Sequence, residues 1–445
     1  MTRPNVIIFF TDQQRFDTTG AHGNPMGLTP NFDRLARQGT HFANAYTIQP
    51  VCGPARSSLQ TGAYPTTTGC WRNGIPLSRD ADTMARRFAQ AGYDTGYIGK
   101  WHLAGKEPVA ADERGGHQFW RGANLLEFVS DAYDTCLFDE DGNECRLPGY
   151  RVDALTDEAI RYVSAKRQSP FFLTVSYLEP HHQNHVDAYP APMGWAEACP
   201  PVWTPPDLVA LGGSSPGQLM GYYGMVKRID DALGRLMDAL MSTGQLENTV
   251  VFFLSDHGCH FKTRNAEYKR SCHESSIRVP MMAVGPGFDG GGKVMAMVSI
   301  IDVAPTLLDA AGLDGPRGAQ GRSALPLIWE RNADWRDDIM VQISESQTGR
   351  ALRTKRWKYA VVAEDDGPPA SSAMVYREAE LYDLDHDPYE LVNLAGTESH
   401  RELSSYLSNL LTMRIAEYEQ LDVEIIPSIA MPTIGQRKVS VSDFS

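Results

Sequence analysis

Short apolar runs rich in β-branched and aromatic residues alternate with amphipathic helical patterns over the first 330 residues. This alternation constrains the fold most, because strands separated by helices form a parallel or mixed sheet with helices packed on it. We therefore expect an α/β fold, with a large, mixed, mostly parallel sheet flanked by helices. The predicted strands are 5–10, 94–98, 171–178, 249–254 and 279–284, and the predicted helices are 30–35, 82–91, 154–166, 218–242 and 302–311.

The pattern changes after about residue 330. Hairpin-like strands are predicted at 339–343, 351–353, 357–362 and 380–382, followed by an amphipathic helix at 399–418. We expect a main domain over 1–330 and a smaller C-terminal α+β subdomain over 331–445, built on an antiparallel sheet. Residues 425–445 have no clear period, and they are interpreted either as an arm on a partner subunit, giving a homo-oligomer, or as a frayed end.

Composition excludes several classes of function. The net charge of −14 argues against a nucleic-acid groove. The seven cysteines are odd in number and lack C-x-x-C spacing, so we expect reduced thiols that mostly pack in the interior. No apolar run reaches the length of a membrane span, and no signal sequence precedes the first strand. We expect a cytoplasmic protein with no membrane or nucleic-acid partner.

The run Cys52-Gly53-Pro54-Ala55-Arg56 lies where a loop should become a helix. Pro54 is pre-set for a first helical turn, and Gly62 stops the helix. Cys52 would then lie at the positive end of a helix, where free N–H groups favour an anion. A cysteine in that place is either a reactive nucleophile or the precursor of one.

Polar residues follow four of the predicted strands. They are Asp12-Gln13, Lys100-Trp101-His102, His181-His182 and Asp256-His257. A single such residue is more often a turn or cap, but ligands of open α/β sheets bind beyond the carboxyl ends of the strands, and four such ends together indicate a site. Asp12, Gln13, Asp256 and His257 offer oxygen ligands and one nitrogen, which suit Ca²⁺, with Mn²⁺ or Mg²⁺ as alternatives. Gln13 and His257 could instead hydrogen-bond the ligands.

In these motifs the chain resembles a type I, formylglycine-dependent sulfatase of the alkaline phosphatase superfamily. The motifs are Asp12-Gln13, Cys52–Gly62, Gly99–His102, Pro180-His181, Asp256–Gly258 and Lys269-x-x-x-His273-Glu274. The segment from Glu380 to Leu394 is similar to the family's closing segment. The resemblance covers nearly the whole chain in the expected order, and it implies an alkaline-phosphatase-like fold.

The resemblance also implies a mechanism. Cys52 would be oxidised to formylglycine by a formylglycine-generating enzyme, and its hydrate would offer one hydroxyl to attack sulfur and one to expel the product. Side chain 52 would join Asp12, Gln13, Asp256 and His257 around the metal. The implied catalytic residues are Cys52, Arg56, Lys100, His102, His181 and Lys269. His181 would protonate the leaving oxygen, and His102 would take the proton from the second hydroxyl.

Two positions depart from the pattern of many family members, which have Asp at the position of Gln13 and Asn at that of His257. This set is closer to branches that include choline-sulfatase-like enzymes and phosphonate monoester hydrolases. The leading hypothesis is a sulfatase acting on a sulfated saccharide or an aryl sulfate. The alternatives are a phosphonate or phosphate ester hydrolase with the same nucleophile, and an inactive binding module, which is disfavoured because every expected catalytic position is filled.

Four residues near these motifs are candidates for substrate binding. His260 and Arg264 lie between the fourth strand and Lys269, His182 follows His181, and Arg72 follows the helix that begins at Cys52. For His260 and Arg264, a solvated loop is an equally good interpretation.

Overall fold

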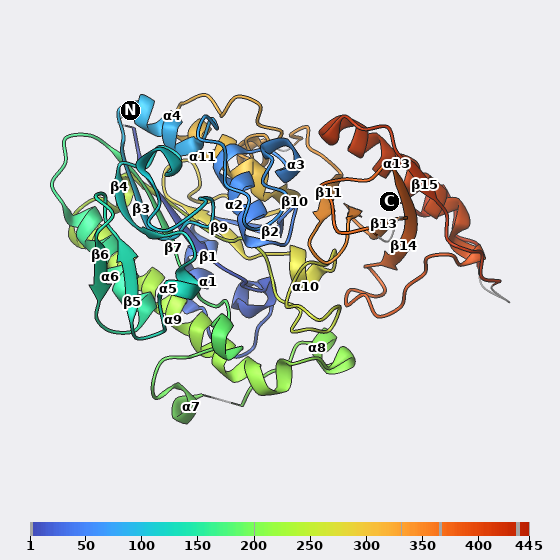
Figure 1. Cartoon of the computed structure of the whole chain (residues 1–445), viewed down its shortest axis with the longest axis horizontal. Helices are drawn as coiled ribbons and strands as arrows, with labels where there is room; N and C mark the ends of the chain where they lie inside the picture. Colours follow the sequence, from blue (N-terminus) through green and yellow to red (C-terminus); the bar gives the residue numbers. More distant parts are fainter. Residues whose placement is uncertain (1–2, 200, 331, 365–366, 433–436, 445) are drawn as a thin grey trace.

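The computed structural model describes residues 3–199, 201–330, 332–364, 367–432 and 437–444. Within these residues the main feature is a ten-stranded sheet of order β10-β2-β9-β8-β1-β7-β3-β4-β5-β6 (Figure 1). Its strands are β1 (Asn5–Thr11), β2 (Thr40–Tyr46), β3 (Asp94–Lys100), β4 (Phe119–Ala123), β5 (Thr135–Phe138), β6 (Glu144–Leu147), β7 (Phe171–Ser176), β8 (Thr249–Ser255), β9 (Met281–Val284) and β10 (Gly292–Ser299).

The centre of this sheet is parallel. β1 pairs in parallel with both β7 and β8, and β3 pairs in parallel with β7 and β4, whereas β5, β6 and β9 run antiparallel to their neighbours. Every residue of β1, β7 and β8 is buried, as expected for strands covered on both faces. The predicted mixed, mostly parallel sheet is confirmed. The strands β2, β4, β5, β6 and β10 were not predicted.

Helices cover both faces of the sheet. Residues Val6, Ile8 and Phe10 of β1 belong to one hydrophobic cluster, while Ile7 and Phe9 belong to another, as the twofold period of a strand requires. The first face carries α2 (Cys52–Thr61), α4 (Met84–Gln90) and α11 (Val303–Ala310), and the second carries α1 (Pro30–Gln38), α6 (Arg151–Ser164) and α9 (Ser215–Ser242). The short helices are α3 (Pro65–Thr68), α5 (Leu126–Val129), α7 (Trp195–Ala198), α8 (Pro206–Leu211), α10 (Glu274–Ile277) and α12 (Pro326–Trp329).

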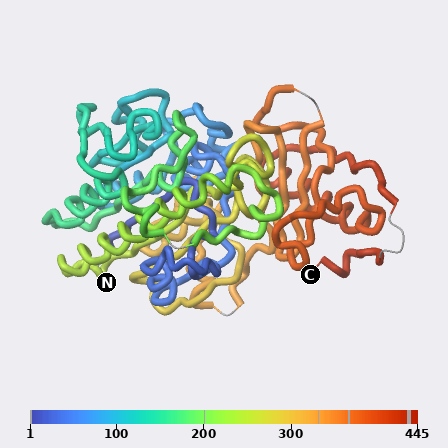
Figure 2. The backbone as a smooth tube through the Cα atoms, turned by 90° about the horizontal axis from the view of Figure 1, so that it is seen from below, coloured from blue at the N-terminus to red at the C-terminus, as the bar shows by residue number. Residues whose placement is uncertain are grey.

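A five-stranded sheet lies at one end of the molecule, in the orange-to-red part of Figure 2. Its strands are β11 (Asp338–Ile343), β12 (Gly349–Thr354), β13 (Trp357–Ala363), β14 (Val375–Asp383) and β15 (Glu424–Ile426). The first four are antiparallel, β15 is parallel to β14, and α13 (Arg401–Glu419) packs on the sheet. The smaller α+β part is therefore confirmed. Its core continues into that of the large sheet, and the boundary at residue 330 stays a prediction.

The described part of the C-terminal tail packs on its own chain. β15 completes the second sheet, the Val439 N–H donates to the Ser399 carbonyl at 2.8 Å, and the Phe444 ring lies 4.9 Å from that of Tyr406. A homo-oligomer formed through the tail stays a prediction.

All seven cysteines are free, as expected. Among the described residues, no helix combines the length and apolar character needed to cross a bilayer.

The close approach of β3 to β7 requires a glycine at position 99. Its φ is +105°, and an added Cβ would lie 2.0 Å from the Ser176 carbonyl oxygen. We expect Gly99→Ala to destabilise the protein by at least about 2 kcal/mol, because strain and overlap add. Gly69→Ala is the control, since φ is +81° there but nothing lies within 4 Å of the added Cβ, and its cost should be about 1 kcal/mol. Thermal unfolding would measure both, and equal losses would contradict the prediction.

Candidate active site

Cys52 lies at the start of a fully buried helix. α2 begins at Cys52, and Gly62 follows its last residue in the left-handed conformation with φ of +71°. This confirms the predicted helix, and Cys52 is only 2% exposed. The N–H of Gly53 donates to the Asn73 side-chain oxygen at 2.9 Å, so a loop 20 residues away holds the start of the helix.

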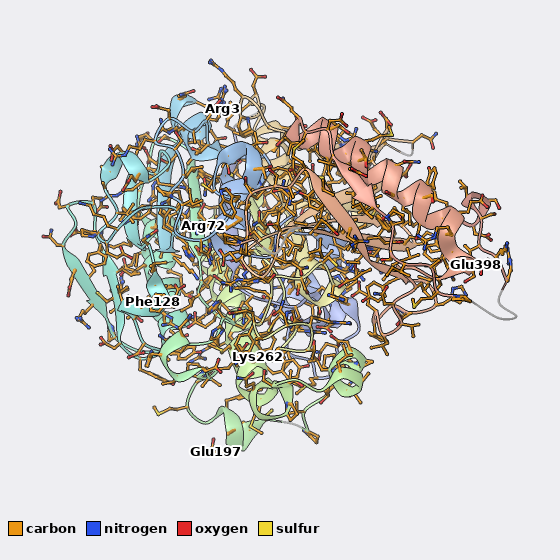
Figure 3. All side chains as sticks on the ribbon, turned by 45° about the vertical axis from the view of Figure 1, so that its right-hand side comes forward. Arg3, Arg72, Phe128, Glu197, Lys262 and Glu398 are labelled. Atoms are coloured by element: carbon orange, nitrogen blue, oxygen red, sulfur yellow. The ribbon has the colours of Figure 1, made fainter. Side chains whose placement is uncertain are left out.

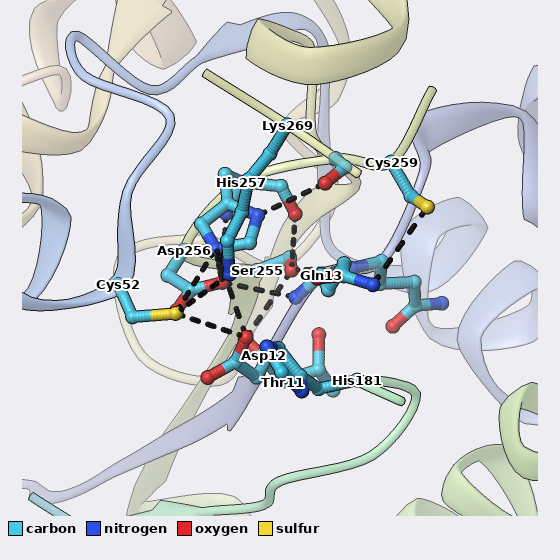
Figure 4. A network of polar contacts seen from close by, with 12 residues as sticks. Thr11, Asp12, Gln13, Cys52, His181, Ser255, Asp256, His257, Cys259 and Lys269 are labelled. Carbon is cyan, nitrogen blue, oxygen red and sulfur yellow. Dashed lines mark hydrogen bonds and ion pairs between the residues drawn. The ribbon is translucent and has the colours of Figure 1, made fainter. Parts of the chain in front are cut away.

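The ends of β1 and β8 bring two carboxylates to this helix start. Because the two strands are parallel neighbours, Asp12 and Asp256 meet at the same edge of the sheet. One ligand atom from each of Asp12, Cys52, Asp256 and His257 lies within 4.8 Å of the others (Figure 4). The Cys52 Sγ is 3.3 Å from His257 Nε2 and 3.5 Å from Asp12 Oδ1.

The donor set fits a divalent cation. His257 Nδ1 lies 2.9 Å from the Gly258 carbonyl oxygen, which can only accept, so Nδ1 carries the proton and Nε2 presents a lone pair to the cluster. The Gln13 side-chain nitrogen donates to the Tyr189 hydroxyl at 3.0 Å, whereas its Oε1 is buried without a hydrogen-bond partner. Two carboxylates, an imidazole nitrogen and an unpartnered amide oxygen are ligands for such an ion. Direct ligation by Gln13 stays a prediction.

Arg56 binds both carboxylates of the cluster. Its guanidinium lies 2.9 Å from Asp12 Oδ2 and 3.4 Å from Asp256 Oδ2. It also donates at 2.8 Å to both the Lys100 carbonyl and the Ser176 hydroxyl. The Oδ1 atoms of the two carboxylates lie 3.7 and 3.5 Å from His257 Nε2. Arg56 therefore compensates the buried charge and orients the carboxylates.

Two lysines add positive charge around Cys52. Lys100 is fully buried, with its Nζ 2.9 Å from both Asp12 Oδ2 and Glu127 Oε1. Lys269 Nζ lies 3.0 Å from the Cys52 Sγ and 3.1 Å from His257 Nε2. Glu127 was not identified from the sequence, because it lies on the short helix α5 and not at a strand end.

His102 and His181 complete the set of predicted catalytic residues near Cys52. The interaction with His102 helps to lower the pKa of the Cys52 thiol, and the interaction with Cys52 raises the pKa of His181. His181 is nonetheless left with a lowered pKa, because burial and then Lys269 disfavour its charged form. The structure therefore brings all six predicted catalytic side chains around one sulfur atom or its carboxylate neighbours.

The charges around the cluster stabilise the anionic form of side chain 52. Burial alone would raise the pKa of the Cys52 thiol, but Lys100 and Lys269 hold it well below its ordinary value. Burial, together with the neighbouring Asp12, raises the pKa of Asp256. A bound divalent cation would relieve this repulsion between the two carboxylates.

The predicted substrate-binding residues fall into two groups. The ring of His182, which is half-buried, lies 4.4 Å from that of Tyr268. Arg72, labelled in Figure 3, is exposed. Its guanidinium lies 5.2 Å from the centroid of the Trp71 ring. His260, in contrast, is buried with its Nε2 3.0 Å from the Lys269 carbonyl. Arg264 donates to the carbonyls of Tyr389 and Glu390 at 2.7 and 2.8 Å. The last two therefore support loops and lie outside the cluster.

Comparisons with known proteins agree with this geometry. The Sulfatase family profile matches residues 4–313, and the profile "N-sulphoglucosamine sulphohydrolase, C-terminal" matches residues 266–417. An ulvan-active sulfatase from Formosa agariphila is 32% identical over 441 residues, covering 94% of this chain and 82% of the relative. An arylsulfatase from Clostridium perfringens is 28% identical over 475 residues, covering 94% and 95%. The crystal structure of yidJ from Bacteroides fragilis shares the fold, with a TM-score of 0.80 at 24% identity, covering 94% and 96%. The chain belongs to the sulfatase family, and it is a sulfuric ester hydrolase.

The donor set predicts how a substitution changes the metal content. Asp256→Asn should lower the bound divalent metal by about one equivalent per chain, because it removes a ligand charge from the cluster. Metal analysis after dialysis would measure this. Asp134→Asn is the matched control, since that exposed carboxylate is 2.8 Å from Arg146 and far along the sheet. Equal metal content in Asp256→Asn and wild type would contradict the assignment.

Proposed function

We propose that this sulfatase hydrolyses the sulfate monoester of a sulfated saccharide or an aryl sulfate, using a formylglycine formed from Cys52. One observation carries the proposal: the Cys52 Sγ lies at the start of α2, 3.0 Å from Lys269 Nζ and 3.5 Å from Asp12 Oδ1. This places side chain 52 between a fixed ammonium group and the carboxylates of the candidate metal site. A formylglycine-generating enzyme would be the maturation partner, and we place the protein in the cytoplasm.

The metal would be held by Asp12, Gln13, Asp256 and His257 together with side chain 52. We propose Ca²⁺, because the set is dominated by oxygen donors, with Mn²⁺ and Mg²⁺ as alternatives. The ion would neutralise sulfate charge, and hydrated formylglycine would supply two hydroxyl groups on one carbon. The side chains of the site are already arranged around this position. Arg56 binds the Oδ2 atoms of Asp12 and Asp256, and His257 Nε2 faces side chain 52.

The other side chains handle charge and protons. Lys100 and Lys269 are fixed cations that stabilise negative charge on the sulfuryl oxygens. His181 is assigned the protonation of the leaving alcohol oxygen, since burial lowers its pKa and makes the charged imidazole a stronger acid. His102, whose interaction with side chain 52 helps to lower the pKa of Cys52, is assigned the acceptance of a proton there.

A sulfated saccharide fits the exposed surface at the site. The Trp71 ring and the Arg72 guanidinium can contact a sugar face and an anionic substituent. On another segment the partly exposed His182 ring, which packs on the buried Tyr268, offers a further aromatic contact. The ulvan-active relative, at 32% identity, supports this substrate class. A phosphonate or phosphate ester is the second candidate, favoured by Gln13 and His257.

Mass and activity measurements test the nucleophile together. The tryptic peptide 38–56 should be about 18 Da lighter than its cysteine form, opposite in sense to stepwise oxidation of a thiol. Matured wild type should hydrolyse nitrophenyl sulfate, and Cys52→Ala should lose at least about a thousandfold in rate because it lacks the nucleophile. Cys70→Ala, which removes another buried thiol, is the control and should retain activity.

Two results would contradict the proposal. Full activity in a sample whose Cys52 peptide is unmodified would exclude formylglycine as the nucleophile. Turnover of a phenyl phosphonate ester that exceeds turnover of nitrophenyl sulfate by orders of magnitude would establish the second candidate instead.

A further inference from the structure

The turn between β11 and β12 reaches from the second sheet to three loops of the active site. The Ser344 hydroxyl accepts a hydrogen bond from Gln49, three residues before Cys52. The Ser346 hydroxyl donates to the Arg270 carbonyl at 2.8 Å, directly after Lys269. Glu345 lies between these two serines, and its side chain is 15% exposed.

Each carboxylate oxygen of Glu345 has a different partner. Oε1 accepts from the Asn73 N–H at 2.5 Å, and Oε2 pairs with the Arg270 guanidinium at 2.6 Å. Glu345 and Arg270 both have φ of +68°, a left-handed conformation that costs of order 1 kcal/mol for such residues. Two strained residues facing each other across an ion pair indicate that the surrounding contacts determine this geometry.

Each partner of Glu345 is connected to one of the proposed reacting groups. Asn73 accepts from the Gly53 N–H through its side-chain oxygen at 2.9 Å, which fixes the residue after Cys52. Arg270 is the residue after Lys269, whose Nζ is 3.0 Å from the Cys52 Sγ. Glu345 therefore connects the two sides of the contact between the nucleophile position and its neighbouring cation.

We propose that Glu345 is a positioning residue for the sulfatase reaction, setting the separation of side chain 52 and Lys269 through Asn73 and Arg270. The proposal rests on the proposed roles of Cys52 and Lys269. It gives the second sheet a part in catalysis, because a carboxylate from that sheet holds both loops. A small displacement of aligned reacting groups is enough to slow a reaction by about a hundredfold.

Steady-state kinetics of Glu345→Ala and Glu345→Gln test the proposal. Glu345→Ala should lower kcat roughly tenfold to a hundredfold with KM changed less than about threefold, because alignment is lost and binding groups remain. Glu345→Gln should fall between Glu345→Ala and wild type, since its amide oxygen can still accept from Asn73. Glu364→Ala is the matched control: Glu364 pairs with Arg377 at an exposed position of the same subdomain, and its kcat should stay within about twofold of wild type.

The double variant Glu345→Ala with Arg270→Ala shows whether Glu345 acts through its partner. The double variant should lose little more kcat than Glu345→Ala alone, because the two changes break the same connection. The proposal is overturned if Glu345→Ala keeps kcat within about twofold of wild type. It is also overturned if the loss of kcat in the double variant equals the product of the losses in Glu345→Ala and Arg270→Ala measured singly. If Glu345→Ala does not fold, Glu345→Gln decides, and wild-type kcat in that variant overturns the proposal.

Failure of the proposed function gives a different result. In that case wild type itself does not turn over sulfate esters, and the variants are compared on the phosphonate ester that it does hydrolyse.

Discussion

The structure depends on the burial of two carboxylates against Arg56 and Lys100. Asp12 and Asp256 are fully buried, with carboxylate oxygens within 4.8 Å of one another. Two buried like charges this close cannot both stay ionised without nearby cations. Arg56 contacts the Oδ2 atoms of both, and Lys100 adds a second cation to Asp12. This arrangement fixes the two carboxylates beside Cys52 with their Oδ1 atoms near His257 Nε2, where a divalent ion would share with Arg56 and Lys100 the compensation of their charge.

The fold was predictable where burial makes the strand pattern simple. β1, β7 and β8 are covered on both faces, so their sequences are almost continuously apolar and identify the centre of the sheet. β2 contains His41 and Asn44 among its apolar residues, and β6 is partly exposed, so neither has a clear pattern. Their place in the sheet depends on pairing with distant strands, which a single sequence does not encode locally.

The candidate site was predictable where it uses strand ends and the helix that begins at Cys52. Parallel strands place Asp12 and Asp256 at one edge, and Cys52 meets them at the start of α2. Glu127 and Glu345 could not be found in this way, because Glu127 lies on the short helix α5 and Glu345 lies in the turn between β11 and β12, outside the strand ends of the large sheet. For His260 and Arg264, a polar loop position does not indicate the direction of a side chain, and both bind backbone carbonyls.

The central claim is that side chain 52 and the buried carboxylates share one divalent ion. Anomalous diffraction from crystals of matured, active protein grown with Mn²⁺ tests it most directly. We expect a peak bounded by Asp12, Asp256, His257 and residue 52. A fully active protein whose crystals show no ion there, with Lys269 Nζ still in contact with residue 52 and His257, would contradict it.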